Sequence, residues 1–163
     1  MKDQNLNISD KVIILFLSWF YSGKFPKAPG TIGSLATLPL IYLLAMYQIN
    51  IYSLLAIILL LYVIACWTTE YIQKKHHLHD PQWIVIDEVI GMLITWSFIM
   101  KNDPASLFLV FFMFRFFDII KFWPASYFDK MKHGIGTITD DVVSAVYAGI
   151  TCLVVQYFFG PAA

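Results

Sequence analysis

Charged residues are scarce in this chain. Asp, Glu, Lys and Arg make up 13% of its 163 residues, whereas an ordinary soluble domain has about 25%. The formal net charge is zero, and there is no basic stripe with interleaved aromatic residues, which excludes a nucleic-acid partner. Hydrophobic residues make up 59% of the chain, and the mean hydropathy is +0.68. These values predict a membrane-embedded protein with residues 1–163 forming one domain, because the apolar runs leave no room for a separate soluble module.

Cysteine is also scarce. Cys66 and Cys152 both lie in apolar runs and lack a C-x-x-C spacing, which argues against a disulfide framework or a structural zinc site. Three histidines, His76, His77 and His79, stand close together without the spacing of a helical zinc site, so a solvated loop is the better interpretation. The N-terminal apolar stretch is followed by no small-x-small pattern, and we expect no cleaved signal peptide.

Apolar runs dominate the rest of the chain and predict an all-α integral membrane bundle of about five spans. Lipid-exposed backbone must satisfy its own hydrogen bonds, so each span should be a helix, and no alternating pattern indicates a barrel. Several runs are shorter than the ~20 residues of a normal span, which suits a compact bundle. Val12–Phe20 is shorter still, and we expect an interfacial or re-entrant helix there. The predicted spans are Ser34–Tyr47, Ile51–Tyr71, Ile84–Met100, Ala105–Ile120 and Asp141–Phe159.

Lysines are concentrated in alternate connections between these runs, whereas the connection after the third run carries Lys101 alone. By the positive-inside rule, the lysine-rich side is cytoplasmic. The polar motifs fall at this same end, so alternation alone predicts that four separated segments build one site. These segments are K-F-P-K-A-P-G-T-I-G-S, H-D-P-Q-W-I-V-I-D-E, R-F-F-D-I-I-K and G-I-G-T-I-T-D-D.

Six acids lie inside or at the ends of apolar runs, where an unpaired charge near the bilayer centre costs ~2.5–3.5 kcal/mol. In the third run, Asp87 and Glu88 stand about one turn inside the start and point about 100° apart, so one can coordinate a metal while the other orients a further ligand. A role in complementing the helix dipole would explain one exposed acid, but explains two embedded ones poorly. The six are Asp80, Asp87, Glu88, Asp118, Asp140 and Asp141.

Arg115, Asp118 and Lys121 follow one another at intervals of three and therefore share a helical face. Arg115 is the only arginine in the chain. Its planar fork suits bidentate binding of a phosphate, and Lys121 can add a point charge. An internal ion pair between Arg115 and Asp118 is the alternative, and the two interpretations are compatible.

Two further segments contain glycine beside a predicted helix start. Asp140 and Asp141 follow G-I-G-T-I-T and open a run without any other charge, which favours metal coordination. The segment Pro29–Ser34, with Gly30, Thr31 and Gly33, precedes the first span, so its amides can face an anion near the positive helix end. A simple connecting turn is the alternative for this second segment.

The donor set points to a chemistry. Oxygen ligands with few sulfur or imidazole donors favour Mg²⁺, which usually binds carboxylates together with substrate phosphate. The sequence therefore predicts metal-assisted phosphoryl transfer or hydrolysis at a membrane surface. The nucleophile, either a metal-bound water or a carboxylate, stays open at this point.

The same segments resemble the phosphatidylglycerophosphatase A family. The resemblance rests on G-T-I-G-S-L, H-D-P-Q-W-I-V-I-D-E-V-I-G-M, F-R-F-F-D-I-I-K-F-W-P and G-I-G-T-I-T-D-D-V, which occur in the family's order from about Pro29 to Tyr147. It implies a multi-pass phosphatase of the bacterial inner membrane that uses Mg²⁺. Its implied substrate is the phospholipid phosphatidylglycerophosphate, which it hydrolyses to phosphatidylglycerol and phosphate.

The resemblance also implies roles for individual residues. All six acids are expected at the metal site, with Asp87, Glu88 and Asp141 as the catalytic candidates. Arg115, Lys121, Gly30, Thr31 and Gly33 are expected to bind the phosphate. The chain departs from the family's pattern where it has F-W-P after Lys121 and Ser144-Ala145 after the acidic pair; neither change removes an ionisable group.

A small cation or proton transporter is the principal alternative, because intramembrane acids also line ion paths. Transport favours acids spread through the membrane depth and related halves. Here the acids cluster at one predicted face, and the chain has no internal repeat. The sequence leaves the number of metal ions and the oligomeric state open.

Overall fold

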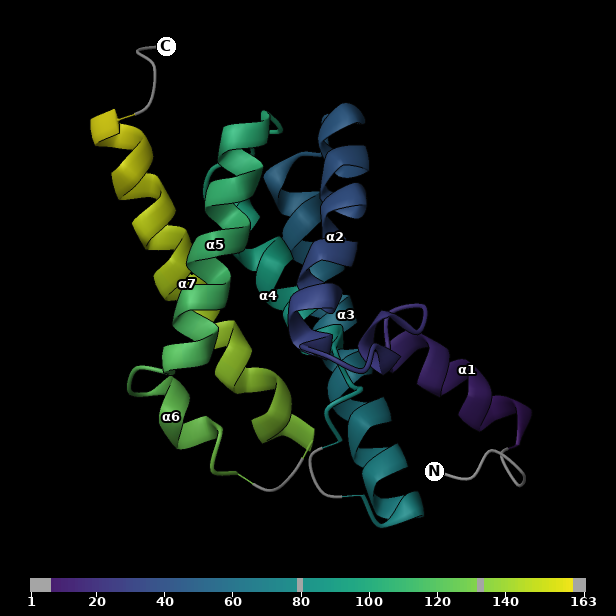
Figure 1. The fold of residues 1–163 in the computed structure, drawn as a ribbon. Helices are drawn as coiled ribbons and strands as arrows, with labels where there is room; N and C mark the ends of the chain where they lie inside the picture. The colour runs from purple at the N-terminus through teal and green to yellow at the C-terminus, as the bar shows by residue number, and fades with distance from the viewer. Residues whose placement is uncertain (1–6, 79–80, 132–133, 160–163) are drawn as a thin grey trace.

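The computed structural model describes residues 7–78, 81–131 and 134–159, with the backbone alone at residues 134 and 135. The described residues form helices and no strand, as predicted. Figure 1 shows the longer helices running roughly along one axis of the molecule. The elements are α1 (Ile8–Leu17), the short 3-10 helix η2 (Ser22–Lys24), α2 (Pro29–Met46), α3 (Ile51–His76), α4 (Ile86–Ser97), α5 (Pro104–Ile120), α6 (Ala125–Phe128) and α7 (Gly134–Phe159).

Three of these helices, α2, α3 and α7, are long and apolar enough to cross a membrane. The predicted number of five spans is not confirmed. Helix α4, at the place of the predicted span Ile84–Met100, has 12 residues and is therefore about 18 Å long, against about 30 Å for a hydrocarbon core. Helix α5, at the predicted span Ala105–Ile120, has 17 residues and reaches about 25 Å.

Helix α4 is apolar although it is short, because it lies inside the bundle. It packs against α2, α3, α5 and α7, and most of its residues are buried. At Gly91, a side chain would collide with the ring of Phe114, so the glycine allows α5 to approach closely. At its other end, the Trp96 indole donates a hydrogen bond to the Lys101 carbonyl at 2.9 Å. This core helix holds Asp87 and Glu88, which are in its first turn, within the protein.

Helix α2 begins five residues earlier than predicted, at Pro29 instead of Ser34. Proline suits the first helical position, because the backbone N–H that it lacks would have no partner there. Ala28 before it adopts a left-handed conformation with φ 49° and turns the chain into the helix. The expected glycine-containing turn is therefore the first turns of α2 itself.

Helix α7 also begins early, at Gly134 rather than Asp141. Asp140 and Asp141 consequently lie about two turns inside the helix instead of at its start. Thr139 also lies inside the helix and not at its N-terminus, and its hydroxyl lies 2.9 Å from the Tyr62 hydroxyl of α3. Both acids thus project from a packed part of α7, which contacts α3, α4, α5 and α6.

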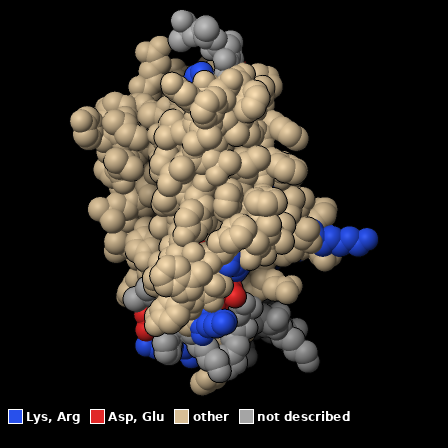
Figure 2. Space-filling model, turned by 90° about the vertical axis from the view of Figure 1, so that its left-hand side faces the viewer, with Lys and Arg blue, Asp and Glu red and all other residues tan. Residues whose placement is uncertain are grey.

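The polar motifs meet at one end of the bundle. The starts of α2, α4 and α7 and the ends of α3 and α5 lie toward the lower part of Figure 1. Figure 2 shows most charged side chains of its face gathered at one end, next to a broad surface with almost none. Large apolar side chains are exposed along α2, α3, α5 and α7, as expected of helices that face lipid. The convergence predicted from alternation is confirmed for the described segments.

Helix α1 lies beside the lower part of α3 and is held there by a buried acid (Figure 1). Asp10 is 1% exposed. Its carboxylate accepts a hydrogen bond from the Lys75 ammonium at 2.8 Å and lies 3.3 Å from the His76 ring nitrogen. The hydrogen bond from Lys75 lowers the pKa of Asp10 below its ordinary value of 3.8, although burial acts in the opposite direction. This ion pair fixes the short N-terminal helix to the end of a long one.

Candidate active site

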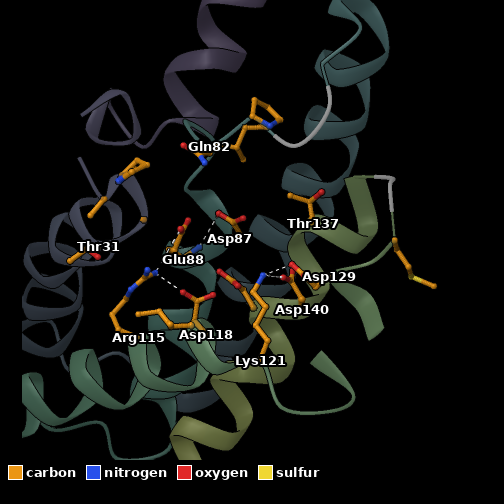
Figure 3. Close-up of a pocket in the computed structure, with 18 of the residues that line it drawn as sticks. Thr31, Gln82, Asp87, Glu88, Arg115, Asp118, Lys121, Asp129, Thr137 and Asp140 are labelled. Atoms are coloured by element: carbon orange, nitrogen blue, oxygen red, sulfur yellow. Dashed lines mark hydrogen bonds and ion pairs between the residues drawn. The ribbon is translucent and has the colours of Figure 1, made fainter. Parts of the chain in front are cut away.

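A cavity of about 790 Å³ occupies the polar end of the bundle. Its walls come from the first turn of α2, the segment before α4, the start of α4, the end of α5, the segment around α6 and the first turns of α7. Figure 3 shows the polar side chains of these segments pointing toward one another. Ten of the lining residues are labelled there: Thr31, Gln82, Asp87, Glu88, Arg115, Asp118, Lys121, Asp129, Thr137 and Asp140.

Three carboxylates form the tightest acidic group in the cavity. Asp87, Glu88 and Asp141 each place one oxygen within 4.8 Å of the others. The two neighbours on α4 converge although adjacent helical side chains diverge, and the Glu88 amide donates to Asp87 Oδ1 at 3.1 Å. Within the described residues, the buried Glu88 Oε2 has no hydrogen-bond partner. Oxygen atoms in this arrangement are ligands of the kind that a hard divalent cation prefers.

Arg115 lies beside this group and is held by two acids. Its Nη1 is 2.7 Å from Asp118 Oδ2 and 3.8 Å from Glu88 Oε1. The predicted ion pair between Arg115 and Asp118 therefore exists. Nη1 lies at ion-pair distance from both acids. Within the described residues, neither Nη1 nor the buried Nε makes a hydrogen bond of good geometry. Arg115 thus lines the cavity as a buried cation that Asp118 orients, and its Nε has no hydrogen bond in the described residues.

Lys121 faces the same cavity from the end of α5. Its ammonium donates to Asp129 Oδ1 at 2.5 Å and to Asp140 Oδ2 at 2.6 Å. Burial alone would lower the pKa of Lys121, but these two hydrogen bonds outweigh it and raise the pKa above its ordinary value. The lysine therefore stays charged, while Asp140 keeps one buried oxygen, Oδ1, without a hydrogen bond in the described part of the chain.

The first turn of α2 closes one side of the cavity with backbone. Gly30 and Thr31 both line it. A side chain at Gly30 would collide with Glu88 Oε1 and lie 3.1 Å from Arg115 Nη1. The glycine is therefore required by close approach, and it brings N-terminal amides of a helix, which carry partial positive charge, to the edge of the acidic group.

The structure brings most of the predicted site residues together. Asp87, Glu88, Asp118, Asp140, Asp141, Arg115, Lys121, Gly30 and Thr31 all line the cavity. Gly33 does not line the cavity. It packs against Val85 instead, where a side chain would collide. Asp80 lies outside the described residues. Ser144 is buried on α7 without a hydrogen bond in the described residues, at a packing position.

Asp129 was not among the predicted residues. It follows α6 in a polar segment, and its partner Lys121 is eight positions away. No helical or metal-ligand spacing links the two, so only the fold of α6 against α7 pairs them. Gln82 and Thr137, which also line the cavity, carry no spacing signal either.

The pairing divides the acids into two kinds. Asp118 is neutralised by Arg115, while Asp129 and Asp140 share Lys121. Asp141 and Asp87 have no cation within ion-pair distance among the described residues, and Glu88 has only the distant 3.8 Å contact with Arg115. The carboxylates without a close cationic partner in the described residues are therefore the three that lie closest together.

Comparisons with known proteins point to one family. The sequence profile of the family described as Phosphatidylglycerophosphatase A matches residues 15–156. The chain is 36% identical over 141 residues to Phosphatidylglycerophosphatase A of Haemophilus influenzae, covering 85% of each chain. It is 37% identical over 142 residues to the protein of that name from Escherichia coli K12, covering 86% of this chain and 79% of that one.

The name of a more distant relative gives a different substrate. A Bacteroides thetaiotaomicron protein, provisionally named a phosphatidylinositol-3-phosphatase, is 28% identical over 152 residues, covering 90% of this chain and 95% of that one. No solved structure matches the chain.

Proposed function

This chain belongs to the phosphatidylglycerophosphatase A family and is a phosphatase, and we propose that it hydrolyses phosphatidylglycerophosphate to phosphatidylglycerol and inorganic phosphate. One observation carries the proposal beyond the family name. A buried guanidinium held by Asp118 lies next to the three closest carboxylates in one cavity. A phosphomonoester needs cationic donors for its oxygens, and the acids supply a place for a metal ion and a base.

The residues present fit Mg²⁺, which the proposal includes as the cofactor. Asp87, Glu88 and Asp141 would hold the ion, since their oxygens already lie within 4.8 Å of one another. The partnerless Glu88 Oε2 and Asp140 Oδ1 are further oxygens without protein donors in the described residues. When bound, Mg²⁺ supplies Lewis-acid stabilisation of charge on phosphoryl oxygens.

Arg115 and Lys121 bind the phosphoryl group in this proposal. Asp118 fixes the direction of the Arg115 guanidinium through Nη1 at 2.7 Å, and Nε has no hydrogen bond in the described residues. Lys121 is held by Asp129 and Asp140 and contributes a second positive charge. The amides at the start of α2 face the same region. Together these donors stabilise charge on the phosphoryl oxygens during transfer.

The carboxylate of Asp87 or Glu88 acts as the base in the hydrolytic step. The oxygen of a water molecule bonds to phosphorus, and its proton passes to the carboxylate. The bond between phosphorus and the glycerol oxygen breaks, and that oxygen takes up a proton and leaves as the hydroxyl group of phosphatidylglycerol. A direct attack by the same carboxylate is the second possible course of the reaction.

We place the cavity at the cytoplasmic face of the bacterial inner membrane. The support is the excess of lysines in the connections at this end of the bundle, because the positive-inside rule assigns the lysine-rich side to the cytoplasm. The lipid tails remain in the bilayer while the head group enters the cavity. A transporter is less well supported, because the buried acids surround a cavity at one end of the bundle rather than a path along it.

Phosphate release from phosphatidylglycerophosphate by purified protein tests the proposal. We expect release with Mg²⁺, none with EDTA, and recovery when Mg²⁺ is restored. Asp87→Asn should lower kcat/KM by about 100-fold or more, the scale of losing one preorganised electrostatic contact.

Asp103→Asn is the matched control. Asp103 caps α5 at the other end of the bundle and accepts a hydrogen bond from the Ser106 amide, and asparagine caps a helix equally well. This variant should keep full activity. Folded wild-type protein that releases no phosphate with any divalent cation would refute the proposed function.

A further inference from the structure

The cavity reaches the lipid-facing surface of the bundle on one side. Among its lining residues is Ile119 of α5, whose side chain is 70% exposed. One exposed isoleucine is ordinary by itself, but Ile119 belongs to the exposed apolar surface of α5, which suits contact with lipid. The cavity therefore has an apolar rim here, although its interior is charged.

The apolar rim continues along α5. Phe108, Phe112, Arg115 and Ile119 are spaced by four, three and four residues, so they lie on one face of the helix. Phe108 and Phe112 are exposed, and their rings stack with centroids 6.0 Å apart. Arg115 stands at the boundary between this face and the core residues Phe114 and Asp118. One helix face thus leads from the guanidinium directly onto an apolar surface.

Helix α2 supplies the opposite rim. Thr31 lines the cavity, and Leu35, one turn further along the same face, is exposed. The two helices pack against each other, and at Gly30 the backbone of α2 comes close to Arg115 because no side chain intervenes. Leu35 and Ile119 are thus exposed apolar side chains one turn beyond the cavity-lining residues Thr31 and Arg115, respectively.

The opposite part of the cavity carries more polar side chains. Gln82, Asp129 and Thr137 line it together with the exposed Met131, and Figure 3 shows Thr137 and Asp129 opposite Thr31 and Arg115. A cavity whose charged groups adjoin an exposed apolar helix face is complementary to an amphiphile whose ionised group is at one end. A water-soluble phosphate ester would need no apolar rim.

We propose that the opening between the first half of α2 and the second half of α5 is a lateral portal for the lipid substrate. Its occupant is the diacylglycerol part of the phospholipid, with the acyl chains against Leu35, Phe112 and Ile119 and the phosphomonoester at Arg115. The inference rests on the proposed phosphatase function and adds to it the path by which the substrate enters and the residues that recognise its tails.

A bulky substitution in the portal tests this. Ile119→Trp fills the rim, and Ile120→Trp is its matched control, because Ile120 is the next residue on α5, is also exposed, and does not line the cavity. Each protein is assayed with long-chain phosphatidylglycerophosphate in mixed micelles and with the deacylated, water-soluble head group. The quantity compared is the ratio of the two kcat/KM values.

We expect Ile119→Trp to lower the ratio of lipid to deacylated turnover by about tenfold, the scale of a steric change in an apolar pocket, and Ile120→Trp to leave it at the wild-type value. Leu35→Trp on the other rim should lower it as well, which keeps the test open if one variant fails to fold. Gel filtration in detergent checks folding.

The outcomes separate the two proposals. Equal ratios in wild type, Ile119→Trp and Leu35→Trp would overturn the portal while leaving the phosphatase function intact. A ratio lowered as much by Ile120→Trp as by Ile119→Trp would overturn it too, because the effect would then belong to the whole helix surface. Wild-type protein that hydrolyses neither substrate would refute the phosphatase function itself.

Discussion

Gly30→Ala is the smallest change that the structure predicts to disable the site. The added methyl group would collide with Glu88 Oε1 and lie 3.1 Å from Arg115 Nη1. Both contact atoms are the far ends of flexible side chains and can shift, but a shift changes the position of Glu88 relative to Asp87 and Asp141 or that of Arg115 relative to Asp118. Relief must come from a shift of the carboxylate, the guanidinium or the start of α2.

The effects on stability and on activity should differ in size. Alanine is favoured over glycine in a helix by at most about 1 kcal/mol, and inserting a methyl group into a packed site costs about 1–3 kcal/mol. The net loss of stability should therefore be about 3 kcal/mol or less. Misplacing a reacting group by about 1 Å costs roughly 100-fold in rate, equivalent to about 2.7 kcal/mol in the activation barrier. Activity should fall far more than the folded fraction.

Thermal unfolding in detergent and kcat/KM for phosphatidylglycerophosphate, measured on the same preparations, check this prediction. Gly149→Ala is the matched control: a methyl group there would collide with the ring of Phe98, between α7 and the end of α4 and away from the cavity. The control should lose stability and keep its activity per folded molecule. If Gly30→Ala retained wild-type kcat/KM, or lost no more than the control, close approach at Gly30 would have no catalytic role.

Two other substitutions probe the ion pairs. Arg115→Lys keeps the charge but removes the planar fork. The value of kcat/KM should therefore fall by about 10- to 150-fold, equivalent to ~1.5–3 kcal/mol for a hydrogen bond to a charged group. Steady-state kinetics at saturating Mg²⁺ measure this, and an unchanged kcat/KM would mean that Arg115 acts only as a positive charge. Asp10→Asn should lower the thermal midpoint at pH 7. Because Lys75 lowers the folded pKa of Asp10 below 3.8, its contribution to stability is present above that pH and is lost as the pH falls through the lowered value. The difference between variant and wild type should therefore shrink in acid, and a difference that persists unchanged at pH 3 would contradict this assignment.

The place of the site could be predicted from the sequence because it depends on alternation. A chain that crosses a bundle repeatedly brings every second connection to the same end, and the polar motifs with Asp87, Arg115 and Asp141 occupy such positions. The donor set predicted phosphoryl chemistry, and the resemblance of these motifs to a known family added the substrate. Both inferences need only the order of segments, and so they tolerate errors in helix boundaries.

The boundaries themselves depend on packing and were predicted less well. Hydropathy places the start of a helix at the first apolar residue, yet α2 and α7 begin within glycine-containing polar segments because their first turns form the wall of the cavity. For α4, hydropathy cannot distinguish burial in protein from burial in lipid, so a 12-residue core helix has the same signature as a span. Pairs such as Lys121 and Asp129 depend on tertiary structure and leave no pattern in sequence.

The division of the acids explains how one cavity can attract both a cation and an anionic ester. Like charges within 4.8 Å of one another repel by roughly 3.5 kcal/mol or more at an effective dielectric constant of 20, so a divalent cation would stabilise the ionised forms of Asp87, Glu88 and Asp141. The paired acids act differently. Asp118 pairs with Arg115, and Asp140 pairs with Lys121. These pairs fix the positions of the two cations and keep them from pairing with the three carboxylates. In the proposed reaction, the phosphoryl group would meet Arg115 and Lys121 already oriented, on the side of the proposed portal.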